Sequence, residues 1–179
     1  HYASFSDLTW DKKPGVLIAT HAKKNNQDGL LLIRAVDGKE QFFVGSWVAD
    51  FSSQGNILIY GYTYSNNKEQ NQQQAYHVLA GDVITRMNIP PLRGRIVSIH
   101  ENPAATYMLI EFEEKGAASF CVIERISDVT PSCHESGLSI YRAQWNPTKD
   151  RELIIETTDH TLYTYDPWDT KAKKISTAW

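Results

Sequence analysis

The sequence predicts an all-β protein built from four similar repeats of antiparallel strands. A strand-like apolar segment recurs four times, at steps of 41, 51 and 44 residues between its leucines. These leucines are Leu17, Leu58, Leu109 and Leu153. The dipeptides Asp37-Gly38 and Gly81-Asp82 separate apolar runs and tolerate the positive φ angles of tight hairpin turns. No window combines helical apolar spacing with capping residues. Strand segments recurring every 40 to 50 residues are typical of a β-propeller.

The expected architecture is one propeller domain over residues 1–179, with four four-stranded antiparallel blades at about 3–45, 46–90, 94–136 and 138–177. The expected strands are 5–10, 16–21, 30–36 and 40–44, then 47–51, 57–64, 75–80 and 83–89, then 96–100, 107–113, 120–126 and 129–133, and finally 140–145, 153–158, 161–165 and 173–176. The second strand of each blade is almost continuously apolar, as expected for a strand buried on both faces. The last strand carries lysines at 171, 173 and 174, which discourage edge-to-edge pairing.

The bulk composition excludes some classes of function. The net charge is −3 and the pI is about 6.1, so the chain carries no basic footprint for nucleic acid. No apolar run approaches the roughly 18 residues of a membrane-spanning helix. The chain begins at His1 rather than Met, and we interpret it as a processed or excised piece of a longer protein.

The fourth repeat resembles the repeats of TolB-like β-propellers. Its first part reads Trp145-Asn146-Pro147-Thr148-Lys149-Asp150, followed by the apolar segment Leu153-Ile154-Ile155. It continues with Leu162-Tyr163-Thr164-Tyr165-Asp166 and ends with Lys174-Ile175-Ser176. The landmarks of WD repeats are missing. The resemblance implies a propeller scaffold, whose default function is binding.

The resemblance also implies a place in the bacterial cell envelope. TolB-like repeats occur in periplasmic binding proteins and in the extracytoplasmic parts of membrane-anchored winged-helix regulators. The first hypothesis is therefore a non-enzymatic binding or sensory module that takes a protein or ligand. The alternative is a noncatalytic propeller segment of a larger enzyme, such as a prolyl-oligopeptidase-type serine peptidase. A third hypothesis is a stand-alone lectin-like or small-ligand propeller.

The two cysteines, Cys121 and Cys133, flank an expected hairpin turn. If the turn centres on Ser127, the two cysteines lie directly opposite each other and could form a disulfide. The alternative is a pair of free thiols that pack as small apolar groups. A disulfide would indicate an oxidising compartment, which favours the periplasm or the cell exterior.

No catalytic, metal or cofactor site is expected. None of the six histidines has the spacing of paired metal ligands. The carboxylates of Glu111, Glu113 and Glu114 are close in sequence, but alternation along a strand sends Glu114 to the opposite face. We interpret this segment as a solvated strand end rather than an acid–base pair.

The candidate contact residues lie in a loop and in two tryptophans. The low-complexity stretch 65–74 is expected to be a loop, with Asn66, Asn67, Gln70 and Asn71 as candidates for binding. Trp168 is expected to be exposed in a hairpin turn, and with Trp179 it is a candidate interface residue. In contrast, Trp10, Trp47 and Trp145 with Phe51 recur near the first strands and are expected in the core between blades.

The number of blades leaves two assemblies open. Four blades could close into a complete ring, or they could be part of a larger propeller. A part of a larger ring would leave apolar blade faces bare, and it would then pair with missing blades or with a second copy.

Overall fold

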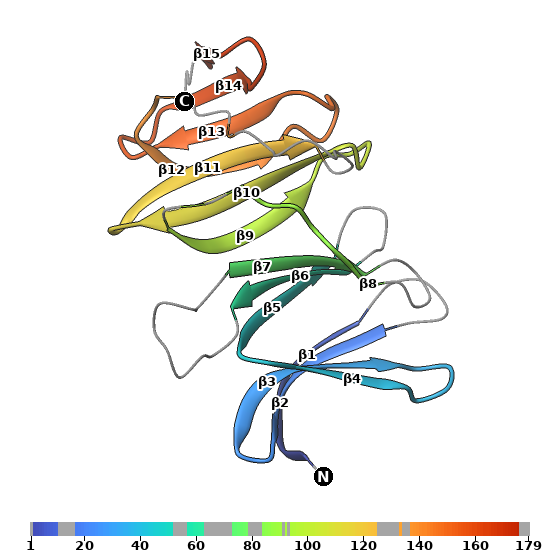
Figure 1. Cartoon of the computed structure of the whole chain (residues 1–179). Helices are drawn as coiled ribbons and strands as arrows, with labels where there is room; N and C mark the ends of the chain where they lie inside the picture. Colours follow the sequence, from blue (N-terminus) through green and yellow to red (C-terminus); the bar gives the residue numbers. More distant parts are fainter. Residues whose placement is uncertain are drawn as a thin grey trace. The chain divides into compact units, whose positions relative to one another are not determined.

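The computed structural model of the chain describes residues 2–10, 17–51, 57–62, 73–78, 84–90, 92, 94–124, 133 and 137–175. These ranges contain fifteen β-strands and no helix, and all paired strands are antiparallel (Figure 1). The chain divides into two compact units, 1–87 and 88–179. The all-β prediction is confirmed. A single propeller domain that spans both units stays a prediction.

Unit 1–87 holds two four-stranded meanders, which match the first two predicted blades. The first has the order β1-β2-β3-β4, and the second has the order β5-β6-β7-β8. Their strands are β1 (Tyr2–Trp10), β2 (Leu17–Lys24), β3 (Gln27–Arg34) and β4 (Glu40–Val44), then β5 (Ser46–Phe51), β6 (Ile57–Tyr62), β7 (Gln73–Val78) and β8 (Ile84–Arg86).

Two turns show why these strands fold back on themselves. Asn25 and Asn26 take positive φ angles of 52° and 62° between β2 and β3, the conformation of a two-residue hairpin turn. At the predicted Asp37-Gly38 turn, the N–H of Gly38 donates to the Arg34 carbonyl at 2.8 Å. The Arg34 guanidinium donates to the Asp37 carboxylate and lowers the pKa of Asp37 to about 2.

The core between the two sheets of this unit is built around Trp47. Its side chain is buried with Leu30, Leu32 and Ile59, and the ring packs 5.6 Å from that of Phe43. The indole Nε1–H donates to the Val44 carbonyl at 3.0 Å, so the polar atom of the ring is satisfied. The prediction that Trp47 packs between blades is confirmed. The side chains of Trp10 and Phe51 lie outside the described residues.

Unit 88–179 differs from the prediction, because its strands form one sheet instead of two separate blades. The sheet has the order β15-β14-β13-β12-β11-β10-β9. Its strands are β9 (Arg95–Glu101), β10 (Tyr107–Glu114), β11 (Ala117–Glu124), β12 (Ile140–Trp145), β13 (Leu153–Thr157), β14 (Leu162–Asp166) and β15 (Lys171–Lys174). Their bounds agree with the predicted strands to within a few residues.

A single register position, Ala118 opposite Ile140, joins the two predicted blades into this sheet. Backbone groups at the edge of β11 need partners, and β12 supplies them where it passes that edge. The predicted fourth strand of the third blade, 129–133, lies outside the described residues except for Cys133. The described strands therefore form two four-stranded sheets and one seven-stranded sheet. These described strands do not form a ring of four separate blades.

The core of unit 88–179 lies between the two halves of its sheet. Nine buried side chains form it: Leu109, Phe120, Val122, Ile140, Ala143, Trp145, Leu153, Ile155 and Tyr165. The repeated leucines at 58, 109 and 153 are all buried, which confirms the interpretation of the recurring segment as the central strand of each repeat. Strand β13 alternates buried and half-buried residues, with Leu153, Ile155 and Thr157 on its buried face.

Candidate functional site

Three hydrogen bonds hold the third and fourth repeats together in unit 88–179. The indole Nε1–H of Trp145 donates to the His100 carbonyl, and the backbone N–H of Ala143 donates to Glu111 Oε1, each at 2.9 Å. Asn102 Nδ2 donates to the Asp150 carbonyl, also at 2.9 Å. The first two contacts fix β12 against β9 and β10, and the third joins the turns that follow β9 and β12.

The side-chain amide of Asn102 forms hydrogen bonds through both its oxygen and its nitrogen. Its side chain is fully buried, and its Oδ1 accepts from the N–H groups of Thr106 and Tyr107 at 2.8 and 2.9 Å. Its Nδ2 donates to Thr106 Oγ1 at 3.1 Å in addition to the Asp150 carbonyl. One side chain thus stabilises the turn between β9 and β10 and ties that turn to the next repeat.

Replacing Asn102 with alanine is expected to lower the free energy of unfolding by about 2–3 kcal/mol, because buried donors and acceptors lose their partners. Asn146→Ala is the matched control, since Asn146 holds the corresponding turn of the fourth repeat through local bonds to Thr148 and Glu152 alone. Its expected loss is about 1 kcal/mol. Urea denaturation measures both. Equal losses would contradict the role of Asn102 between repeats.

Two β-bulges in this unit change the direction in which apolar side chains point from their strands. The β9–β10 register shifts between Ile96 and Ser98, which leaves Val97 as the extra residue of β9. The β12–β13 register shifts in the same way between Ile140 and Arg142, which leaves Tyr141 as the extra residue. Val97 is 50% exposed and Tyr141 is 59% exposed, so each bulge presents a large apolar side chain to solvent. Bulges of this kind are enriched beside functional sites.

Both bulge residues line an open groove of about 940 Å³. Small residues of the β10–β11 turn and of β11 supply part of its wall, and the segment that leads into β12 supplies another part. The lining residues are Val97, Glu111, Phe112, Glu113, Gly116, Ala117, Ala118, Ser119, Leu138, Ser139, Ile140, Tyr141, Arg142 and Thr158. At Gly116 a φ of 83° closes the turn, and an added Cβ there would meet nothing within 4 Å. We call this feature the bulge groove.

Glu111 lies in the bulge groove, and its role differs from the predicted one. Its Oε2 accepts from the Ser98 hydroxyl and lies 4.0 Å from His100 Nε2, while its Oε1 accepts from the Ala143 N–H. The side chain is 22% exposed, so the interpretation of this position as a solvated strand end is wrong. Cross-strand neighbours and β12 surround the carboxylate because it faces the fourth repeat. Its Oε1 links the third repeat to the fourth, and its Oε2 links β10 to β9 within the third repeat.

The positive charge in the groove is already paired. Arg142 Nε donates to Glu156 Oε2 at 2.7 Å, and the other carboxylate oxygen of Glu156 lies 2.9 Å from His160 Nδ1. The hydrogen bonds from His160 and Arg142 lower the pKa of Glu156, so its carboxylate stays ionised to lower pH than usual. Arg142 is therefore already in an ion pair with a carboxylate of its own sheet.

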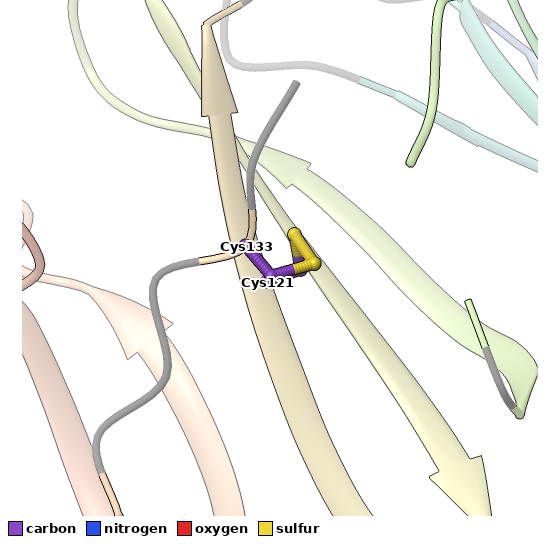
Figure 2. The surroundings of a disulfide bond; sticks show 2 residues. All are labelled: Cys121 and Cys133. Carbon is purple, nitrogen blue, oxygen red and sulfur yellow. A yellow bond between two sulfur atoms is a disulfide. The ribbon is translucent and has the colours of Figure 1, made fainter. Parts of the chain in front are cut away.

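The structure agrees with the disulfide, which is one of the two alternatives that the sequence left open for the cysteines. Cys121 of β11 and Cys133 form a disulfide with their Cα atoms 4.5 Å apart (Figure 2). That separation is typical of directly opposed residues in a non-hydrogen-bonded antiparallel pair. It agrees with the predicted register, although no strand is described at Cys133.

Of the residues predicted to make contacts with a partner, only Trp168 lies in the described part of the chain. Trp168 was expected to be exposed, yet it is half-buried, with its ring centroid 4.3 Å from that of Tyr107 and the Arg151 guanidinium 4.6 Å from the ring centre. It packs against the core because its turn folds back over β10, so its role at an interface stays a prediction. The candidates Asn66, Asn67, Gln70, Asn71 and Trp179 lie outside the described residues.

The groove residues Val97 and Tyr141 were not identified from the sequence. Both occur in ordinary strand patterns, and nothing in a single sequence marks the shift of register that exposes them. Among the described residues, no group of three or more His, Cys, Asp or Glu side chains is placed to hold a metal ion. No helix in the described ranges is long and apolar enough to cross a membrane.

Comparison with known proteins supports the fold and little beyond it. No protein-family model matches the chain, and no curated protein sequence matches it. Among solved structures, the crystal structure of TolB from Acinetobacter baumannii is similar, with a TM-score of 0.53 and 11% sequence identity over 97% of this chain. The chain spans 43% of that protein. This likeness shows a TolB-like, β-rich fold.

Proposed function

We propose that this chain is a non-enzymatic, propeller-type binding module of the bacterial cell envelope, which takes a protein or a ligand in the bulge groove. The observation that carries the proposal is the pair of bulges that aim Val97 and Tyr141 into one open groove. Exposed apolar side chains beside a few polar groups are typical of recognition surfaces. The serines at 119 and 139 supply hydroxyls at the same surface.

The groove is chemically suited to binding rather than to acid–base work. Glu111 accepts from the Ser98 hydroxyl and from the Ala143 N–H, so hydrogen bonds within its own sheet hold its carboxylate in place. The TolB-like fold supports the same proposal, since propellers are scaffolds that present surfaces and loops.

An envelope location is supported by the cysteine pair. Disulfides persist in oxidising compartments, such as the periplasm and the cell exterior. A sensory role as the extracytoplasmic part of a larger regulator is the finer form of this proposal. It rests on the TolB-like repeats of the sequence.

Site-resolved NMR tests the binding function. Isotope-labelled chain is titrated with a panel of capped amino acids and five-residue peptides that vary in charge and apolarity. We expect at least one member to shift the amide signals of Val97, Ser119, Ser139 and Tyr141 together. The double substitution Val97→Ser and Tyr141→Ser should abolish those shifts, because it removes both apolar contacts.

Val36→Ser is the matched control for this experiment. Val36 is 76% exposed but lies in the other unit, in the turn after β3, so its loss should leave the titration unchanged. Shifts confined to residues 65–74 would locate binding at the loop predicted from the sequence and would contradict the groove. A panel without any effect at the groove would contradict the proposed function of this surface.

A further inference from the structure

The charges that line the bulge groove do not cancel. The lining holds one cation, Arg142, whose Nε lies 2.7 Å from Glu156 Oε2 of the same sheet. Glu111 accepts from a neutral hydroxyl and a neutral backbone N–H, which stabilise a carboxylate without cancelling its charge. His100 Nε2, 4.0 Å from Oε2, adds a positive charge only when the imidazole is protonated. Two carboxylates, those of Glu111 and Glu113, therefore give the groove a negative balance.

Glu113 is the carboxylate that a ligand can reach. Its side chain is 47% exposed, and its ion pair is with Arg95 at 3.7 Å. Arg95 is itself 68% exposed, and pairs of this kind in water contribute little. A cation that arrives in the groove can replace or share this contact at small cost. Glu111, 22% exposed, adds its charge from deeper in the same lining.

The two bulge residues supply the other half of the recognition chemistry. Val97 offers an aliphatic surface, and the face of the Tyr141 ring attracts cations as well as apolar groups. Side chains of lysine and arginine combine an apolar stem with a charged head, so one such side chain can satisfy both kinds of contact.

We propose that the bulge groove binds a lysine- or arginine-bearing segment of a partner protein, with the apolar stem between Val97 and Tyr141 and the charged head at Glu113. The groove is open and, at about 940 Å³, larger than a single side chain, which suits a segment of chain rather than an isolated cation. The small residues Gly116, Ala117 and Ala118 leave room for the backbone of that segment. This inference rests on the proposed binding function and adds the class of partner.

Three capped pentapeptides that differ only at the central residue test the inference. Each has alanine at the other four positions, with lysine, norleucine or glutamate in the centre. Labelled chain is titrated with each peptide, and the shifts at Tyr141, Val97 and Ser119 give the affinity. The lysine peptide should bind about tenfold more tightly than the norleucine peptide, which has the same stem without the charge. Its affinity should fall as salt is added.

Variants of neighbouring residues separate charge from shape. Glu113→Gln should weaken the lysine peptide about fivefold and leave the norleucine peptide unchanged, because the shape of the groove is kept. Glu114→Gln is the control, since Glu114 is next in the same strand but does not line the groove, and it should change neither affinity.

The other outcomes each overturn a defined part of the inference. Equal binding of lysine and norleucine peptides would overturn the cationic partner while leaving a binding groove in place. Tighter binding of the glutamate peptide would show that Arg142 dominates and would also overturn it. If capped lysine alone binds as tightly as the lysine pentapeptide, the ligand is a small organic cation and the partner segment is overturned. If no pentapeptide binds although another member of the panel shifts the groove, the inference fails and the proposed function stands.

Discussion

Replacing Trp145 with alanine is expected to lower the free energy of unfolding of unit 88–179 by about 3–5 kcal/mol. Trp145 is 8% exposed and lies in the core between the two halves of the seven-stranded sheet. Its removal leaves a large cavity and also deprives the His100 carbonyl of its Nε1–H donor. Because small domains are stable by only about 5–15 kcal/mol, a loss of this size would leave much of the unit close to unfolding.

Trp145→Phe separates the two contributions. Phenylalanine keeps most of the apolar contact and loses the hydrogen bond, so the expected loss is about 1–2 kcal/mol. Urea denaturation monitored by circular dichroism measures both variants, and hydrogen exchange shows whether β9 and β12 lose protection first. An equal loss in the two variants would mean that the hydrogen bond, and not the buried ring, holds the repeats together.

Removing the disulfide should lower the stability of the same unit by about 2–3 kcal/mol, toward the low end of the range for native disulfides, because the closed loop is short. The double substitution Cys121→Ala and Cys133→Ala is preferable to serine. Cys121 is fully buried, and a buried serine hydroxyl would add a cost of its own. Thermal unfolding with and without reductant measures the effect.

The matched control for the disulfide is the reductant itself. It should destabilise the natural chain by about as much as the double substitution does, and it should have no effect on the double variant. Intact-mass measurement without reductant should give a mass lower by two hydrogen atoms than that of the reduced chain. Two alkylatable thiols in protein taken from its native compartment would contradict both the disulfide and the envelope location that it supports.

The parts of the fold that follow from local pattern were predictable. The recurring leucines at 58, 109 and 153 are buried, and the Asp37-Gly38 hairpin forms as its residues indicate. The Cys121–Cys133 disulfide is the first of the two alternatives that the sequence left open, and it agrees with register counting across the expected turn. The turns at Asn25-Asn26 and Lys115-Gly116 were missed, although asparagine and glycine at positive φ are the expected signals of such hairpins.

The candidate site could not be found in the same way. Val97 and Tyr141 occupy inward or outward positions according to whether their strands contain a bulge, and one extra residue in a strand changes that phase. In a strand of alternating residues, the sequence predicts Glu111 to be a surface carboxylate. It is half-buried and linked to the fourth repeat only because β12 lies against it. Contacts of this kind join residues about 30 to 45 positions apart, beyond the reach of any local pattern.

By itself, therefore, the sequence determined the all-β class, the four recurring strand groups and the central apolar strands, and it gave the pairing of Cys121 with Cys133 as one of two alternatives. These depend on alternation, turn chemistry and short-range register, which a chain carries locally. Only the tertiary structure decided that the third and fourth repeats share one sheet through Ala118 and Ile140, and that two bulges open a groove beside Glu113. The shared sheet depends on which strand has an unpaired edge when the repeats pack. The backbone N–H and C=O groups of that edge form hydrogen bonds with the strand that lies beside it.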